Sequence, residues 1–272
     1  MRSMNFSKYR VKPGSKVDLK DWDPDDKSAS PGNKEEDEKR LTELGGRIDE
    51  LQELLYAEAK RGVLVVLQGM DTSGKDGTIR HVFREIDPLG VRAVRFKTPT
   101  EDELAHDFLW RVHPHAPGKG ELVIFNRSHY EDVLVVRVHR LIDEAECKLR
   151  YDAINAFERL LVDNNTVILK FYLHISKDEQ RERLQARLDD PKKQWKFNVN
   201  DLTERKLWSD YMKAYTDALA ATSTDWAPWY IVPSNSKMNR NLFISSVLLE
   251  TLDGLKMRYP KPNQKLDEIE VK

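Results

Sequence analysis

One stretch of the chain restricts its possible folds more than any other: VLVVLQGMDTSGKDGTIR, from Val63 to Arg80. Val63–Leu67 is a run of apolar residues, as in a strand buried on both faces of a sheet. It leads into GMDTSGK at 69–75, which has the glycine and lysine spacing of a phosphate-binding loop, and a helix is expected from about Asp76. Because the motif requires a strand before it and a helix after it, the stretch predicts a phosphate site.

The loop should bind phosphate through its main chain. Its glycines allow a tight turn that points N–H groups inward, and the N-terminus of the following helix adds positive potential. Lys75 would reach the terminal phosphates as a point charge. The predicted phosphate ligands in this segment are Gly69, Thr72, Ser73, Gly74, Lys75, Asp76 and Gly77.

Two carboxylates beside a phosphate site need an explanation. Asp71 could cap backbone N–H groups of the loop, hold a metal ion, or accept a proton. We favour metal coordination, because a bare carboxylate repels polyphosphate unless a cation lies between them. Asp76 stands where the motif usually has Ser or Thr, and it can instead act as a favourable acid in the first helical turn.

A polar cluster follows a third predicted strand, Leu122–Phe125. Phosphate-loop enzymes commonly place a magnesium carboxylate here, but this chain has Asn126, which offers a neutral oxygen. Glu131 could supply the missing charge, or Glu131 and Asp132 could be surface acids paired with Arg137 or Arg140. Arg127 is a candidate anion clamp, and His129 is expected to be a hydrogen-bonding wall residue.

The segment SKDEQRERLQARLDDPKKQWKF, from Ser176 to Phe197, is a candidate lid. Arg183 and Arg187 share one helix face, and Lys193 lies in the basic loop that follows. Such charges usually form a solvated helix face with partial pairing of the Glu179–Arg183 kind. In a lid they would instead close over the phosphates and neutralise charge on the transferring group. Pro191 would end the helix as a hinge, within a lid of about 178–207.

Strands and helices alternate along the chain, which predicts a doubly wound parallel sheet with ligands at the carboxyl ends of the strands. Residues 1–32 are polar and read as an extended arm or partly ordered tail, followed by a single domain over 33–272. Beyond the segments already named, the expected strands are 91–96, 166–175 and 229–232, and the expected helices are 33–61 (weakened or kinked at Gly45-Gly46), 100–112, 143–163, 176–188, 202–221 and 239–257.

Composition limits the partners. Lys and Arg number 45 against 46 acids, so a polyanion must be gripped by a local basic groove, and nucleic acid is not expected. The only cysteine, Cys147, excludes a disulfide framework and is expected to be buried. No apolar stretch has the length of a membrane span and the N-terminus lacks a secretory signal, which predicts a cytoplasmic protein without membrane partners.

Several of these stretches, in order from about Tyr9 to Tyr259, resemble the polyphosphate kinase-2 family. Besides the loop and lid segments, they include HDFLWRVH at 106–113, FNRSHYEDV at 125–133 and APWYIVPSNSK at 227–237. The resemblance implies a P-loop kinase-like, three-layer α/β/α fold, similar to thymidylate kinases, with a parallel sheet and a helical lid. It also implies transfer of the terminal phosphate of inorganic polyphosphate to nucleotides, reversibly and with Mg²⁺, for which Mn²⁺ could substitute.

The resemblance also assigns roles. It makes Asp71 and Lys75 essential, Arg127 a phosphate ligand and Arg187 the lid arginine, with Asp71, Asn126 and Glu131 as expected metal ligands. Many relatives have Asp at the position of Asn126, and the Asn form resembles the subgroup that phosphorylates both AMP and ADP. Family members assemble as dimers or tetramers. Apart from the resemblance, Asp107, Arg111 and Asp132 are our candidates for contacts with the nucleotide.

Two other functions fit the same predicted fold. An ATP-dependent nucleotide or nucleoside kinase would use the same loop with a different donor. A nucleotide-binding switch protein would also carry a phosphate loop, but guanine-binding switches need an Asn-Lys-x-Asp element late in the chain. The last predicted strand leads instead into Pro233-Ser234-Asn235-Ser236.

Overall fold

The computed structural model describes residues 6–30, 32–262 and 269 and confirms the predicted α/β fold. Its centre is a five-stranded sheet in the order β2-β3-β1-β4-β5, with every adjacent pair parallel. The central position of β1 explains its uninterrupted apolar sequence, because it is hydrogen-bonded on both edges and covered on both faces. The strands are β1 (Gly62–Gln68), β2 (Val91–Arg95), β3 (Leu122–Asn126), β4 (Thr166–His174) and β5 (Trp229–Pro233).

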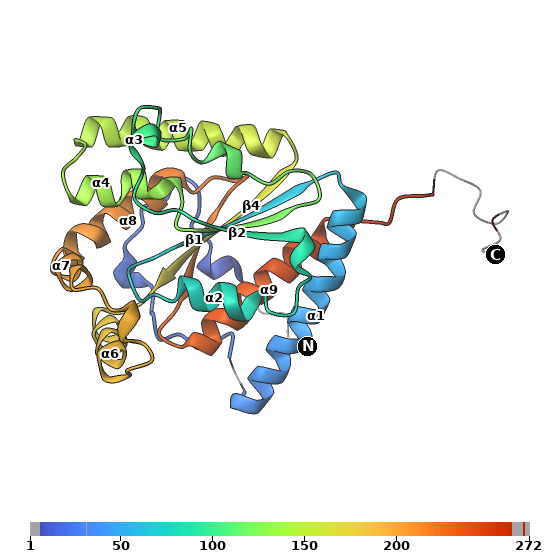
Figure 1. Cartoon of the computed structure of the whole chain (residues 1–272), viewed down its shortest axis with the longest axis horizontal. Coiled ribbons are helices and arrows are strands. Elements are labelled where there is room, and N and C mark those ends of the chain that lie inside the picture. The colour runs from blue at the N-terminus through green and yellow to red at the C-terminus, as the bar shows by residue number, and fades with distance from the viewer. Residues whose placement is uncertain (1–5, 31, 263–268, 270–272) are drawn as a thin grey trace.

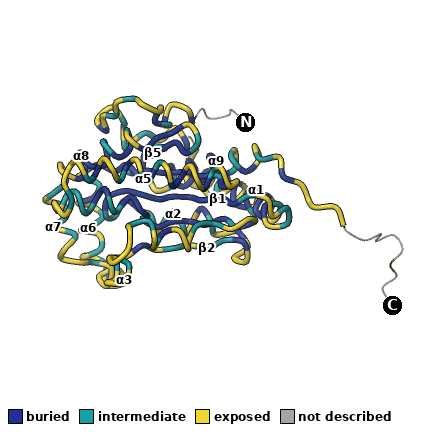
Figure 2. The backbone as a smooth tube through the Cα atoms, turned by 90° about the horizontal axis from the view of Figure 1, so that it is seen from above, coloured by how far each residue is buried: buried dark blue, intermediate teal, exposed yellow. Residues whose placement is uncertain are grey.

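Helices cover both faces of the sheet, which makes three layers (Figure 1). Alternate β1 residues point to opposite faces, so that Leu64 and Val66 join one hydrophobic core while Val63 and Val65 join the other. In the tube view the buried sheet runs between more exposed outer layers (Figure 2). One layer contains α1 (Lys34–Glu58), α2 (Lys75–Val82) and α9 (Lys237–Gly254), and the other contains α4 (Val135–Val138), α5 (Glu144–Asp163) and α8 (Trp208–Thr222).

The N-terminal segment lies against the domain over its described residues, 6–30. Phe6 and Tyr9 pack edge-on against Phe243 of α9 at 5.0 and 4.9 Å between ring centroids. Farther along, the backbone N–H of Val11 donates to the carbonyl oxygen of Trp229 at 2.9 Å. The segment therefore protects the free edge of β5, although its regular structure is limited to two short 3-10 turns, Phe6–Tyr9 and Leu19–Asp21.

The prediction of a single helix over 100–112 is wrong. The Thr100–Glu103 capping box is present, but it opens a helix, α3, of only Glu101–Leu104. Asp107 then accepts hydrogen bonds from the backbone N–H groups of Leu109 and Trp110, at 3.0 and 3.1 Å. An aspartate in this position begins a new turn, which competes with continuation of the helix.

The glycine pair at 45–46, predicted to weaken or kink the helix over 33–61, lies within a continuous α1 from Lys34 to Glu58. Another helix prediction needs correction. The helix expected to continue to about Ala221 is divided at Leu207 into α7 (Asn200–Lys206) and α8. Before it, the candidate lid contains α6 (Lys177–Asp189) and a 3-10 turn, Gln194–Lys196. Parts of the predicted arm, 1–32, and of the predicted domain, 33–272, lie outside the described residues. These parts are residues 1–5, 31, 263–268 and 270–272.

Candidate active site

The phosphate loop connects β1 to α2 and depends on two glycines. Gly69 and Gly74 have φ angles of 152° and 107°, a backbone conformation that other residues rarely adopt. A Cβ on Gly69 would lie 2.7 Å from the Ser73 hydroxyl oxygen and 2.8 Å from the Leu173 carbonyl oxygen. The tight turn therefore leaves no room for a side chain at this position, as the motif requires.

Two arginines support the loop through its carbonyl oxygens. Arg183 of α6 donates to the carbonyl oxygens of Thr72 and Ser73 at 2.8 and 3.0 Å, and also to those of Ser234 and Asn235. Arg240 of α9, which is 2% exposed, donates to the carbonyl oxygen of Ser73 at 3.2 Å. Burial and the neighbouring Arg183 lower the pKa of Arg240 to about 9. Arg183 was predicted to bind phosphate, and it also lines the cavity described below. Arg240 was not predicted.

Lys75, the first residue of α2, turns its ammonium group back to the loop. Its Nζ donates to the carbonyl oxygens of Gly69 at 2.6 Å and Met70 at 3.2 Å. Burial, with the positive charge of Arg127, lowers the pKa of Lys75 to about 8 despite the nearby acids. The lysine is therefore held at the predicted phosphate position in an environment that would favour an added anion.

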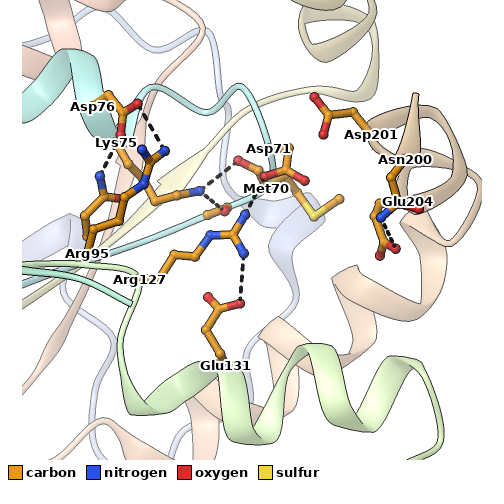
Figure 3. A network of polar contacts seen from close by, with 12 residues as sticks. Met70, Asp71, Lys75, Asp76, Arg95, Arg127, Glu131, Asn200, Asp201 and Glu204 are labelled. Carbon is orange, nitrogen blue, oxygen red and sulfur yellow. Dashed lines mark hydrogen bonds and ion pairs between the residues drawn. The ribbon is translucent and has the colours of Figure 1, made fainter. Parts of the chain in front are cut away.

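Arg127 lies between two carboxylates (Figure 3). Its Nη2 donates to Asp71 Oδ1 at 3.0 Å, and its Nη1 is 3.6 Å from Glu131 Oε2. Arg127 follows β3 with a φ of 62°, which turns the chain sharply at the strand end, and Glu131 lies on the 3-10 turn His129–Val133. Glu131, with Asp71, raises the pKa of Arg127 and keeps the guanidinium charged.

Asn126 and Asp76 form a second polar pair at this edge of the sheet. Asn126 Nδ2 donates to Asp76 Oδ1 at 2.6 Å, and Arg95 Nη2 of β2 is 3.5 Å from Asp76 Oδ2. Partial burial raises the pKa of Asp76, but the Asn126 hydrogen bond and Arg95 outweigh it and leave that pKa below its usual value. The three predicted metal ligands are thus separated: Asp71 and Glu131 contact Arg127, whereas Asn126 contacts Asp76. No cluster of three acidic, histidine or cysteine ligands occurs among the described residues.

The candidate lid faces the loop with paired charges. Arg187 Nη1 of α6 is 3.3 Å from Asp201 Oδ2 of α7, and Lys193 Nζ is 2.7 Å from Asp190 Oδ2. Burial and the facing Asp71 raise the pKa of Asp201, against the effect of Arg187. The carboxylate of Asp201 thus partly neutralises the arginine that the sequence assigned to the transferring phosphate.

The loop, the end of β3 and the lid enclose one cavity of about 520 Å³. It brings together the predicted Asp71, Lys75, Arg127, Arg187 and Lys193. Several other wall residues were not predicted, because an exposed basic residue in a sequence carries no signal that distinguishes a cavity wall from ordinary surface. The charged lining consists of Lys75, Arg80, Arg95, Arg127, Arg183, Arg187, Lys193, Lys196 and Lys237, with Asp71, Asp76 and Asp201.

The three residues assigned to the nucleotide do not line this cavity. Asp107 caps the turn already described, and Arg111 donates to the Lys97 carbonyl oxygen at 2.8 Å. Asp132 is 3.8 Å from Arg150, and burial raises its pKa to about 6. The pairing of Glu131 and Asp132 with Arg137 or Arg140 is not found, since Arg137 contacts Glu144 and Asp217.

A buried charge network on the α5 side of the sheet was also not predicted. Lys170 of β4 and Glu158 of α5 are both fully buried, with Nζ and Oε2 2.6 Å apart. Lys170 also donates to the hydroxyl of Tyr130, and His129 Nε2 is 3.3 Å from Glu158 Oε1. The hydrogen-bonding role predicted for His129 is confirmed, but this histidine is 1% exposed and does not line the wall of the cavity. The lone lysine inside the apolar run VILKFYL was the available signal. The pair anchors the 3-10 turn that carries Glu131.

Comparisons with known proteins identify the family of this chain. The polyphosphate kinase 2 (PPK2) family model matches residues 32–260. The AMP/ADP-polyphosphate phosphotransferase of Meiothermus ruber is 56% identical over 98% of this chain and 100% of its own length. The ADP-polyphosphate phosphotransferase of Rhodopseudomonas palustris is 45% identical over 93% of this chain and 91% of its own.

A solved structure shows the same fold. The crystal structure of Polyphosphate Kinase 2 from Arthrobacter aurescens TC1 superposes with a TM-score of 0.92 at 44% identity, over 95% of this chain and 92% of that one. The residues from the phosphate loop to the last helix lie within the matched family region. The chain belongs to the polyphosphate kinase 2 family.

Proposed function

We propose that this protein transfers the terminal phosphate of inorganic polyphosphate to nucleoside mono- and diphosphates, reversibly. The observation that carries the proposal is the charge of the cavity, where nine basic side chains face three carboxylates. A donor and an acceptor that are both phosphate chains bring more negative charge into one site than a neutral acceptor does. The surplus of cations suits two such chains meeting end to end.

The chemistry needs little acid–base help. The attacking group is an ionised phosphate oxygen, so catalysis consists of positioning and charge neutralisation. Lys75 and the loop N–H groups would hold one chain, and Arg127 would neutralise the other near the end of β3. Arg187 of the lid would exchange Asp201 for the equatorial oxygens of the transferring group. Similar phosphoanhydride bonds break and form, so the reaction should run in both directions.

Magnesium fits this donor set as an ion shared with substrate. Mg²⁺ in phosphoryl-transfer sites is held by one or two carboxylates and completed by phosphate oxygens and water. Asp71 lines the cavity, and Glu131 shares Arg127 with it, so these two carboxylates would hold the ion once phosphates draw Arg127 away. The ion would supply positive charge that offsets the negative charge of the phosphates. Asn126, bonded to Asp76, would at most offer its carbonyl oxygen.

Both AMP and ADP are proposed acceptors, in line with the name of the Meiothermus ruber relative. We also propose a homo-oligomer, dimeric or tetrameric, in the cytoplasm, where nucleotides are available. Over the described residues no helix is both long and apolar enough to cross a bilayer.

The test is nucleotide formation with polyphosphate as the sole donor. Purified protein with Mg²⁺ and polyphosphate should convert ADP to ATP and AMP to ADP. Chromatography measures the nucleotide products. Lys75→Ala is the control. It should lower the rate of product formation by about 10²-fold or more, because a positive charge that stabilises the transition state is lost. Product from ATP and a nucleoside, but none from polyphosphate, would favour the ATP-dependent kinase. Slow hydrolysis without any transfer would favour the switch protein.

A further inference from the structure

The outer face of α5 carries an apolar stripe that the domain does not cover. Leu149 and Leu160 are 65% and 50% exposed, which is unusual for leucines on a helix whose opposite face is fully buried. Ala156 between them is also exposed, and Ala153 is partly so. The helix forms the outer edge of its layer in Figure 1. The stripe therefore lies open at the surface of the domain.

The spacing of the stripe is that of a helix–helix seam. Leu149, Ala153, Ala156 and Leu160 follow one another at intervals of four, three and four residues. This is the heptad pattern, in which apolar positions line a contact with a second helix. The core side of α5 uses a different set of residues, which includes Cys147, Tyr151, Ile154 and Leu161. The seam is thus a second apolar face and not an extension of the core.

The pattern is also symmetric about its own middle. Leu149 and Leu160 lie at equal distances from the midpoint between Ile154 and Asn155, and so do Ala153 and Ala156. If two copies of α5 pack antiparallel about a two-fold axis at that midpoint, each leucine meets the other leucine of the partner. The alanines then meet at the centre, where small side chains let the helices approach. Such self-complementarity is what a two-fold interface requires.

The charges along one flank of the seam obey the same symmetry. On a helical projection Lys148, Asp152, Arg159 and Asp163 lie on one side of the stripe. In the antiparallel arrangement Arg159 falls about 3 Å along the axis from Asp152 of the partner subunit, and Asp163 a similar distance from the partner subunit's Lys148, at 1.5 Å of rise per residue. Opposite charges therefore meet across the proposed seam. In this structure Arg159 contacts only its own Asp163, at 2.8 Å, among the described acids.

A helix pair alone is small for a stable interface, which commonly buries about 1,600 Å² in total. The apolar surface continues on the other flank, where a cavity is lined by Trp110 together with Phe157 of α5. Trp110 is 42% exposed, and Leu104 of α3 is 70% exposed. The proposed contact can therefore extend beyond α5 to the 104–113 segment.

We propose that the outer face of α5 is a docking surface for a second copy of this chain, packed antiparallel with Leu149 against Leu160 of the partner subunit. The proposal locates an interface for the homo-oligomer proposed above, and it is independent of the reaction. Its experiments therefore use mass and cross-linking as readouts, which the failure of the proposed activity would not affect.

The first test measures mass in solution by light scattering. The double variant Leu149→Glu with Leu160→Glu should halve the mass of the wild-type oligomer, because four carboxylates would meet in one seam. Leu89→Glu is the matched control, since Leu89 is 86% exposed and lies in a turn away from α5, and it should leave the mass unchanged. Unchanged circular dichroism would show that both variants fold. A monomeric wild-type protein, or a double variant of unchanged mass, would overturn the proposal.

The second test distinguishes the orientation and does not depend on a disruptive variant. Leu149→Cys and Leu160→Cys proteins, each alone, should give no disulfide on mild oxidation, because identical positions would lie about 16 Å apart along the axis. Co-expressed, they should form a disulfide between the two variants. The native Cys147 is 1% exposed and should not compete. A disulfide in the Leu149→Cys protein alone would indicate parallel packing, and none in the mixture would contradict the contact.

Discussion

The side-chain amide of Asn126 donates a 2.6 Å hydrogen bond to the carboxylate of Asp76. Each residue is a departure from the usual pattern, since Asp76 replaces the loop hydroxyl and Asn126 replaces a magnesium carboxylate. The two departures therefore compensate one another. A carboxylate at both positions would place two negative charges in hydrogen-bonding contact, which raises the pKa of one of them strongly.

The pair leads to a prediction about exchanging the amide and the carboxylate between positions 126 and 76. Asn126→Asp should lower turnover at neutral pH by about tenfold or more, since the two carboxylates would repel each other or share a proton. The double variant Asn126→Asp with Asp76→Asn restores one amide and one carboxylate, and should recover most of the loss, as coupled neighbours do. Steady-state rates against Mg²⁺ concentration measure both. If the double variant is no better than the single one, the pair does not act as a unit.

This pair also shows where sequence reasoning stopped. The buried strand, the glycine spacing and the alternation of elements are local patterns, and they were sufficient to predict the parallel sheet and the phosphate loop. The contact of Asn126 with Asp76 joins residues fifty positions apart, and it depends on the adjacency of β1 and β3 in the sheet. Nothing in the sequence near either residue indicates that contact.

Arg240 and Asp107 illustrate two further reasons why parts of the structure could not be predicted from the sequence. A charged residue in a helix is normally exposed, so burial of Arg240 behind the loop could be known only from the packing of α9. At Asp107 a side chain competes with the backbone for hydrogen bonds, and periodicity does not weigh that competition. Both the support behind the loop and the end of α3 therefore required the structure.

The lysine of the loop should give the enzyme a characteristic pH dependence. Because burial lowers the pKa of Lys75 to about 8, the free protein loses this positive charge as the pH rises above that value. The kcat/KM for polyphosphate should therefore fall through about pH 8, whereas kcat should fall at higher pH, because bound phosphates stabilise the ammonium. In Lys75→Arg, whose side chain stays charged, the residual kcat/KM should lack this fall. A wild-type profile that is flat from pH 7 to 9.5 would contradict the prediction.

The close approach of Gly74 and Arg240 predicts non-additive stability. A Cβ on Gly74 would lie 1.9 Å from Arg240 Nη1, so Gly74→Ala combines a steric clash with unfavourable backbone strain. In an Arg240→Ala background the clash is absent, and strain of roughly 1–2 kcal/mol should remain. Urea unfolding of the two single variants and the double variant should therefore give a coupling free energy of about 1–3 kcal/mol. If the changes in the free energy of unfolding simply add, the Arg240 side chain moves aside freely.

Arg187 is the residue through which the lid should act. It now faces Asp201 at 3.3 Å, but it lines the cavity and would exchange that partner for phosphate when substrates bind. Arg187→Ala should lower kcat by about 10²-fold or more with a smaller change in KM, because the lost charge acts mainly on the transition state. Arg181→Ala is the matched control on the same helix, since Arg181 is 67% exposed, pairs with Asp178 and does not line the cavity. It should keep near-normal rates, and equal losses in both variants would assign the effect to the stability of α6 instead of to the transferring group.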